Sequence, residues 1–101
     1  MKEIKSKHKV PIRLTNERWL HITEEHPEMA GYYYEVLETI QDPESIYKGN
    51  HEECIAIKQT ELGKYIVVIY KEINNKDGFV ITAFLTRKIK KLERRIKIWP
   101  I

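Results

Sequence analysis

The stretch at residues 65–70 most constrains how this chain can fold, because it is apolar without a break and rich in β-branched side chains. Such a run is typical of a central strand that is covered on both faces. Residues 74–78 follow with asparagines and a glycine that tolerate positive φ, which is typical of a hairpin loop. Residues 79–87 then alternate, so the sequence predicts two antiparallel strands at the centre of a sheet.

Two further strands are predicted from shorter patterns. Residues 53–60 alternate, with Cys54 and Lys58 on the same face. Residues 10–14 also alternate, and Pro11 favours a place at the sheet edge. Cys54, the only cysteine, has no partner for an internal disulfide, and its pattern predicts a small buried residue rather than a reactive thiol.

The strand at residues 79–87 is predicted to have one apolar face and one mixed face. Strict alternation places on the mixed face Val80, Thr82, Phe84 and Thr86. A mixed face of this kind can border a functional site.

A first helix is predicted from about Asn16 to His26, with Thr15 or Asn16 as its N-cap and Pro27 as its break. A second helix begins at residue 27 or 28 and ends before the turn at residues 42–45. Its apolar stripe is formed by Met29, Tyr33, Val36, Leu37 and Ile40. The order of elements predicts one α+β domain over residues 1–101, with the helices packed on one face of the sheet.

The net charge of the chain is +3, but the charged residues are distributed unevenly along it. Residues 1–14 carry +4 and residues 87–101 carry +6, whereas residues 15–53 carry −8. Residues 1–9 are expected to form a basic arm, mobile or paired as an edge strand. The tail at residues 88–101 has helical spacing and then strand alternation, so its structure stays open. If both ends lie on one side of the fold, they form a surface that attracts polyanions.

The composition places the chain in the cytoplasm. No run approaches the roughly 20 apolar residues of a membrane span, and the basic N-terminus lacks the apolar stretch of a secretory signal.

Two histidines among carboxylates make residues 19–28 the first candidate for chemistry, because histidine changes charge near neutral pH. Glu25 follows His21 by four residues and could orient its imidazole. His21 and His26 are five apart, which turns them about 140° from each other on a regular helix. Both can face one substrate only if the break at Pro27 lets His26 swing round. In the alternative interpretation His21 is a solvent-exposed residue and His26 is a half-buried structural one.

Other site types fit the sequence less well. The segment lacks the His-Glu-x-x-His spacing of a zinc helix, so no metal site and no cofactor are expected. There is no Gly-rich phosphate loop and no nucleophile elbow. The cations of residues 87–101 are either a solvated face or a phosphate-binding strip.

The ordered set of motifs resembles the phage-associated barnase/EndoU/colicin/RelE-like (BECR) nucleases over residues 15–88. The motifs are His-Ile-x-x-x-His-Pro-Glu at residues 21–28, the helix end at residues 40–44, the apolar strand at residues 66–68 and Val-Ile-Thr-Ala-Phe at residues 80–84. The resemblance implies two N-terminal helices packed on a four-stranded antiparallel sheet. It also implies a metal-independent ribonuclease, often a toxin encoded near phage genes or with an antitoxin or immunity protein.

In such enzymes the 2′-hydroxyl of RNA attacks the adjacent phosphate, which requires a general base, a general acid and donors for the phosphorane. Carried over by position, the resemblance makes His21 and His26 the acid and base and Thr82 a hydroxyl donor. Lys58 takes the place of a basic residue on an earlier strand, where the family tends to carry an arginine. Substrate contacts would come from Arg87 and Lys88. The alternative function is a non-catalytic module on the same scaffold that binds RNA or a protein.

Overall fold

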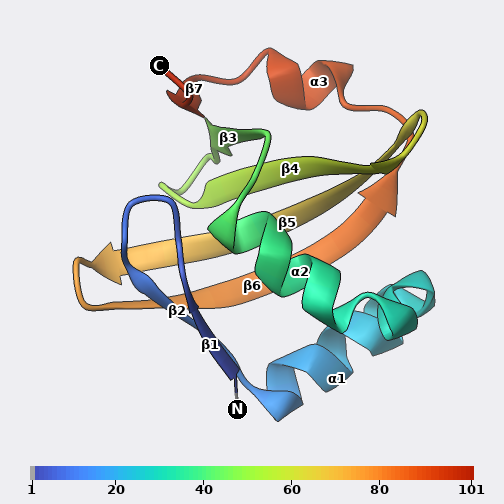
Figure 1. Ribbon diagram of the computed structural model, residues 1–101, viewed down its shortest axis with the longest axis horizontal. Helices are drawn as coiled ribbons and strands as arrows, with labels where there is room; N and C mark the ends of the chain where they lie inside the picture. Colours follow the sequence, from blue (N-terminus) through green and yellow to red (C-terminus); the bar gives the residue numbers. More distant parts are fainter. Residues whose placement is uncertain (1) are drawn as a thin grey trace.

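The hairpin expected from residues 65–87 lies at the centre of the protein in the computed structural model, which describes residues 2–101. Strand β5 (Lys64–Asn74) pairs antiparallel with β6 (Asp77–Thr86) on one side and with β4 (Cys54–Glu61) on the other (Figure 1). Neighbouring side chains of β5 point to opposite faces, and Val67 and Val68 are both fully buried. The prediction of a central strand covered on both faces is confirmed.

The expected fold of two helices on a four-stranded antiparallel sheet is wrong. The protein is a mixed α+β fold with three short α-helices and a seven-stranded sheet of order β1-β2-β6-β5-β4-β3-β7. The additional strands are β1 (Lys2–Lys5), β3 (Ser45–Lys48) and β7 (Lys97–Trp99). Each has only three or four residues, and each is defined by the strand beside it. All neighbours are antiparallel except β2 (Pro11–Leu14), which runs parallel to β6 and pairs with it at Arg13 and Phe79.

The sheet curls until its two edges approach each other. The turn between β1 and β2 brings Lys7 Nζ to 4.5 Å from the centroid of the Trp99 ring, which belongs to β7 at the opposite edge. The same amine lies 3.6 Å from Asp42 Oδ1. Of the arm predicted over residues 1–9, Lys2–Lys5 form an edge strand and residues 6–9 form the turn to β2; Met1 lies outside the described residues.

The first helix follows the prediction closely. Helix α1 spans Asn16–Glu25, and the Oγ1 of its N-cap Thr15 accepts a hydrogen bond of 3.1 Å from the amide of Arg18. The helix stops before Pro27, as expected. The second predicted helix is divided, because Pro27–Gly31 forms the 3-10 helix η1 and α2 begins only at Tyr33, extending to Gln41. Proline has no amide to donate and Gly31 has a low helix propensity, so this segment closes only the tighter 3-10 turns.

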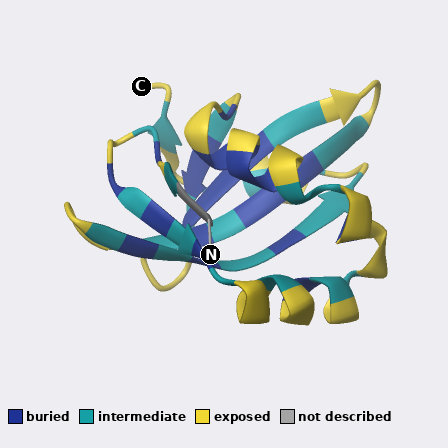
Figure 2. Ribbon diagram, turned by 60° about the horizontal axis from the view of Figure 1, so that its bottom comes forward, coloured by how far each residue is buried: buried dark blue, intermediate teal, exposed yellow. Residues whose placement is uncertain are grey.

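Helices α1 and α2 with η1 cover one face of the sheet, called here the inner face, and the main core lies between them and the sheet (Figure 2). Fully buried side chains meet there from helices and strands, among them Ile22, Met29, Val36, Ile40, Ala56, Ile66, Val68 and Tyr70. The opposite, outer face carries a smaller cluster around Val67, Ile55 and Ile57. Ile89 and Leu92 from helix α3 (Lys90–Glu93) and the residues before it pack against this cluster. The first half of the basic tail therefore folds over the outer face, whereas Ile98 and Trp99 near its end pack against the main core.

A β-bulge in the central hairpin corrects the predicted alternation of β6. Tyr70 pairs with Val80, whereas the preceding Ile69 pairs with Thr82, so Ile81 is the extra residue. Val80 consequently joins the inner core together with Ala83. The mixed outer face of β6 keeps Thr82, Phe84 and Thr86 but loses Val80.

A substitution at Gly78 tests how closely β2 packs on the central hairpin. A Cβ at this position would lie 2.5 Å from the carbonyl oxygen of Lys71 and 2.6 Å from Ile12 Cδ1. We expect Gly78→Ala to lower the free energy of unfolding by about 2 kcal/mol, because the backbone must shift. The matched variant Gly31→Ala, where a Cβ meets nothing within 4 Å, should change it by less than about 0.5 kcal/mol. Urea unfolding measures both values, and equal effects would contradict this packing.

Candidate functional site

Helix α1 runs beside β6 and in the same direction, which is visible at the bottom of Figure 1. At its start a cavity of about 220 Å³ is lined by Thr15 and Arg18 from the helix segment and by Phe79 and Val80 from β6. At its end the ring centroids of His26 and Phe84 lie 5.8 Å apart. Because β2 pairs with β6 only at Phe79, α1 and η1 replace a neighbouring strand along the rest of this edge within the described residues.

His26 occupies the break between α1 and η1. Its backbone, with φ −131° and ψ 77°, has left the helical region, and its half-buried ring packs on Phe84 of the outer face. The carboxylate beside it is Glu28, whose Oε2 is 3.8 Å from His26 Nδ1. Glu28 was not among the partners predicted from the sequence. The signal was Pro27, which begins the 3-10 turn that brings residue 28 back to residue 26.

His21 is exposed and lies on α1 between Arg18 and His26. It follows Arg18 by three residues and therefore shares its side of the helix. Arg18 borders Phe79 near the start of α1 and His26 borders Phe84 at its end, so the helix carries His21 past the same edge of β6 on its exposed side. The described residues give neither His21 nor Glu25 a side-chain hydrogen bond or ion pair, so the structure adds no support for Glu25 as the orienting group.

Thr82 faces the outer side of the sheet, two residues from Phe84 and paired with Ile69. Lys71 follows Ile69 by two residues and is the diagonal neighbour of Thr82, at a Cα separation of about 7–8 Å. The Nζ of Lys71 donates a 3.1 Å hydrogen bond to the carbonyl of His51. Lys71 was missed from the sequence because it belongs to no recognisable motif. We call His21, His26, Lys71, Thr82 and Phe84 the edge site.

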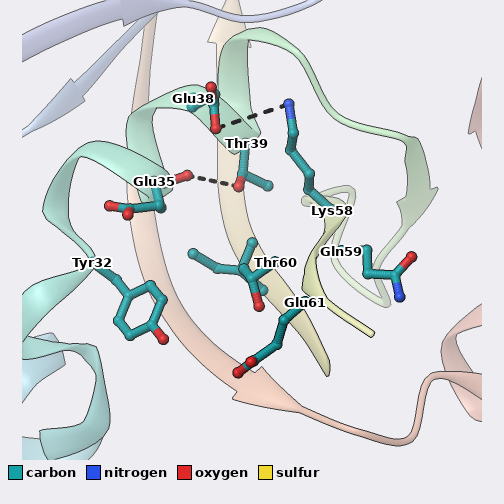
Figure 3. A pocket seen from close by; sticks show the side chains of 9 residues that line it. Tyr32, Glu35, Glu38, Thr39, Lys58, Gln59, Thr60 and Glu61 are labelled. Atoms are coloured by element: carbon teal, nitrogen blue, oxygen red, sulfur yellow. Dashed lines mark hydrogen bonds and ion pairs between the residues drawn. The ribbon is translucent and has the colours of Figure 1, made fainter. Parts of the chain in front are cut away.

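The structure does not bring Lys58 to this site. Lys58 lies on the inner face, where its Nζ donates a 2.9 Å hydrogen bond to the carbonyl of Asp42 at the end of α2 and lies 3.6 Å from Asp42 Oδ2 and 4.0 Å from Glu38 Oε1 (Figure 3). A lysine in this place caps the negative end of the helix. Lys58 pairs with Ile66 on β5, and Ile66 pairs with Leu85 on β6. Leu85 is about 10 Å along the strand from Thr82 and on the opposite face of the sheet.

The surroundings of Lys58 have a different character from the edge site. Lys58 lines a cavity of about 380 Å³ between α2 and β4, with three carboxylates from Glu35, Glu38 and Glu61 in its wall. Figure 3 shows Glu35 and Glu38 on the helix and Glu61 on the strand. Since this wall is mainly acidic, it is a poor place for a phosphate.

Arg87 and Lys88 lie at a second place on the outer face, beyond the end of β6. The Oγ1 of Thr86 accepts a 3.1 Å hydrogen bond from the amide of Lys88 and orders this turn. A cavity of about 810 Å³, called here the tail cavity, is lined by Tyr65, Arg87, Lys88, Ile89, Lys90, Lys91, Glu93 and Arg94. Among the described residues none of its five cations forms an ion pair. Such unpaired cations leave a strongly positive surface.

The buried titratable groups of the core are inert by contrast. Burial raises the pKa of the Cys54 thiol to about 11, and the nearby charge of Glu72 adds to the effect. Burial also raises the pKa of Tyr70, whose hydroxyl has no hydrogen-bond partner among the described residues. A thiol with this pKa stays protonated at neutral pH and is a weak nucleophile. Cys54 is buried, as the sequence predicted.

Comparisons of the chain with protein-family models, with curated proteins and with solved structures find no match. Within residues 2–101 no three histidine, cysteine or acidic side chains are grouped so that they could hold a metal ion. No helix in that part of the chain has the length and apolar character needed to cross a membrane. We therefore infer what the site does from its own residues.

Proposed function

We propose that the protein is a metal-independent endoribonuclease whose reaction takes place at the edge site. The observation that carries the proposal is the position of His26, which packs on Phe84 beside Thr82 and faces the sheet surface that leads to the tail cavity. A titratable imidazole, a hydroxyl and a cation around one surface are the groups that RNA cleavage requires. Membership of the BECR nucleases, a toxin role and an antitoxin or immunity partner stay predictions from the resemblance.

The chemistry assigns one task to each side chain. His26 takes the proton of the 2′-hydroxyl as its oxygen attacks phosphorus, and the carboxylate of Glu28 stabilises the imidazolium that forms. His21, protonated, gives a proton to the 5′-oxygen as the P–O5′ bond breaks. Lys71 stabilises the negative charge on the phosphorane as a point charge, and Thr82 stabilises it as a hydroxyl donor. The products are a 2′,3′-cyclic phosphate and a free 5′-hydroxyl.

Incubation of the pure protein with an unstructured RNA in excess EDTA tests this proposal. We expect cleavage that is insensitive to the chelator and yields fragments with 2′,3′-cyclic phosphate ends, detected by mass spectrometry. The His26→Ala variant, purified in parallel, controls for contaminating ribonucleases. RNA that stays intact although the protein binds it would contradict the proposal and favour the non-catalytic module.

A further inference from the structure

We propose that the tail cavity is a nucleotide-binding subsite for single-stranded RNA, in which an unpaired base stacks on Tyr65 and the flanking phosphates contact the cations. This inference rests on the proposed function for the identity of the polymer. The inference goes beyond that function in two ways. It names a second RNA-binding place on the surface, away from the reacting groups, and it gives the protein a preference for unpaired strands.

The lining of the cavity carries the first step of the argument. An aromatic ring from the sheet faces a short basic segment, and the side chains that define the subsite are Tyr65, Arg87, Lys88, Lys90, Lys91 and Arg94. An aromatic ring beside cations is the combination by which proteins bind single strands, because each base has a face for stacking and each nucleotide has one negative charge.

The state of these cations carries the second step. Several lysines elsewhere in the chain are engaged with carboxylates, such as Lys58 with Asp42 and Lys48 with Glu52. The five cations of the tail cavity have no acidic partner among the described residues, and the cavity includes one carboxylate, that of Glu93. The segment is also held in place, because Arg95 donates a 2.8 Å hydrogen bond to Asn50 Oδ1. The cations are therefore free to bind phosphate and are presented on a folded surface.

The path from the tail cavity to the edge site carries the third step. Tyr65 pairs with Thr86, and Thr86, Phe84 and Thr82 follow one another on the outer face of β6. Thr82 and Thr86 are four positions apart on the strand, a distance of about 13 Å. A strand of RNA anchored at Tyr65 can thus reach Thr82 and His26 along one face. A duplex offers no unpaired base to Tyr65, which makes single strands the preferred ligand.

Binding of a fluorescein-labelled, unstructured 12-nucleotide RNA, followed by fluorescence anisotropy in EDTA, tests the subsite. The assay uses the His26→Ala background so that the RNA stays intact, and a blunt duplex of the same sequence serves as competitor. We expect the single strand to bind more tightly than the duplex. Tyr65→Ala should weaken the binding of the single strand roughly tenfold, because one stacked base is lost.

Matched variants separate stacking from packing and from net charge. Tyr65→Phe keeps the ring and should bind within about twofold of the parent, whereas Tyr65→Leu keeps an apolar side chain in the sheet and should bind as weakly as Tyr65→Ala. Tyr34 is 73% exposed on α2, so Tyr34→Ala is the aromatic control and should leave binding unchanged.

Arg94→Ala should lower the slope of log Kd against log salt concentration by about 0.7, the value for one lost phosphate contact of a single strand. Lys76→Ala, at the other end of the hairpin, should leave the slope unchanged.

Two results would overturn the inference. One is equal binding of single strand and duplex with no loss in Tyr65→Leu, which would make the tail a nonspecific polyanion surface. The other is a loss on Lys76→Ala as large as on Arg94→Ala. This assay does not measure cleavage, so its result can be interpreted even if the proposed reaction does not take place. Weak binding by a protein that still cleaves RNA would refute the subsite. Strong and selective binding by a protein that does not cleave RNA would refute the proposed enzyme.

Discussion

The variant His26→Ala is expected to lose RNA cleavage by a factor of about a hundred or more, because general acid–base catalysis contributes that much or more to such reactions. The loss should appear in kcat rather than in RNA affinity, since the cations that we propose to hold RNA lie in the tail cavity. His26→Gln should be equally inactive. Glutamine retains hydrogen-bonding atoms and much of the volume against Phe84 but cannot take up a proton near neutral pH.

Single-turnover cleavage of a defined RNA measures this effect, and thermal unfolding shows whether the variants are folded. His8→Ala is the matched histidine control. His8 lies in the β1–β2 turn with its Nδ1 3.0 Å from Glu72 Oε1, and Glu72 pairs with Gly78 at the start of β6, six residues before Phe84, so its loss should change cleavage by less than about twofold. Retained activity in both His26 variants would exclude His26 from catalysis.

The same assay distinguishes the two lysines. Lys71→Ala should lower the rate about tenfold or more, because a charge next to the phosphorane is lost. Lys58→Ala should leave the rate nearly unchanged, since Lys58 lies on the inner face with Asp42. The reverse result would support the site expected from the sequence over the one inferred from the structure.

The variant Ile12→Ala is expected to lower the free energy of unfolding by about 2–5 kcal/mol. Ile12 is fully buried in β2, and its Cδ1 lies against the backbone of Gly78. Truncation removes this contact and leaves a cavity beneath the β1–β2 hairpin. The midpoint of thermal unfolding should fall by about 10 °C or more.

Ile73→Ala is the matched control, because Ile73 is 53% exposed near the end of β5. It should alter the free energy of unfolding by about 0.5 kcal/mol or less. If Ile12→Ala were as mild as this control, the β1–β2 hairpin would not be part of the cooperative core. It would then behave as the mobile basic arm that was one alternative from the sequence.

Local features of the chain could be read from the sequence because local chemistry decides them. Pro27 ends α1 through a clash and a missing donor, and Thr15 caps it with a hydroxyl, whatever lies around them. The central strand and its hairpin follow from a run of apolar residues and a turn sequence. Cys54 was assigned to the core on the same alternation.

The candidate site could be predicted only in part. His21, His26 and Thr82 were named from the sequence; the structure places His26 against Phe84, two residues from Thr82, and leaves His21 on the exposed side of the same helix. Lys58 was named by its order in the chain, but order does not say which face a strand residue takes. Lys71 and Tyr65 drew no attention, because neither belongs to a recognisable motif.

By itself the sequence determined the elements with strong periodicity, the break at Pro27 and the segregation of charge, since each depends on residues close together in the chain. Only the tertiary structure decided where the three short strands pair, the bulge at Ile81 and the course of α1 beside β6. The physical reason is that backbone hydrogen bonds between strands and packing across the sheet depend on partners far away in sequence. A shift of one residue in β6 moves Thr82 to the other face, and with it the site.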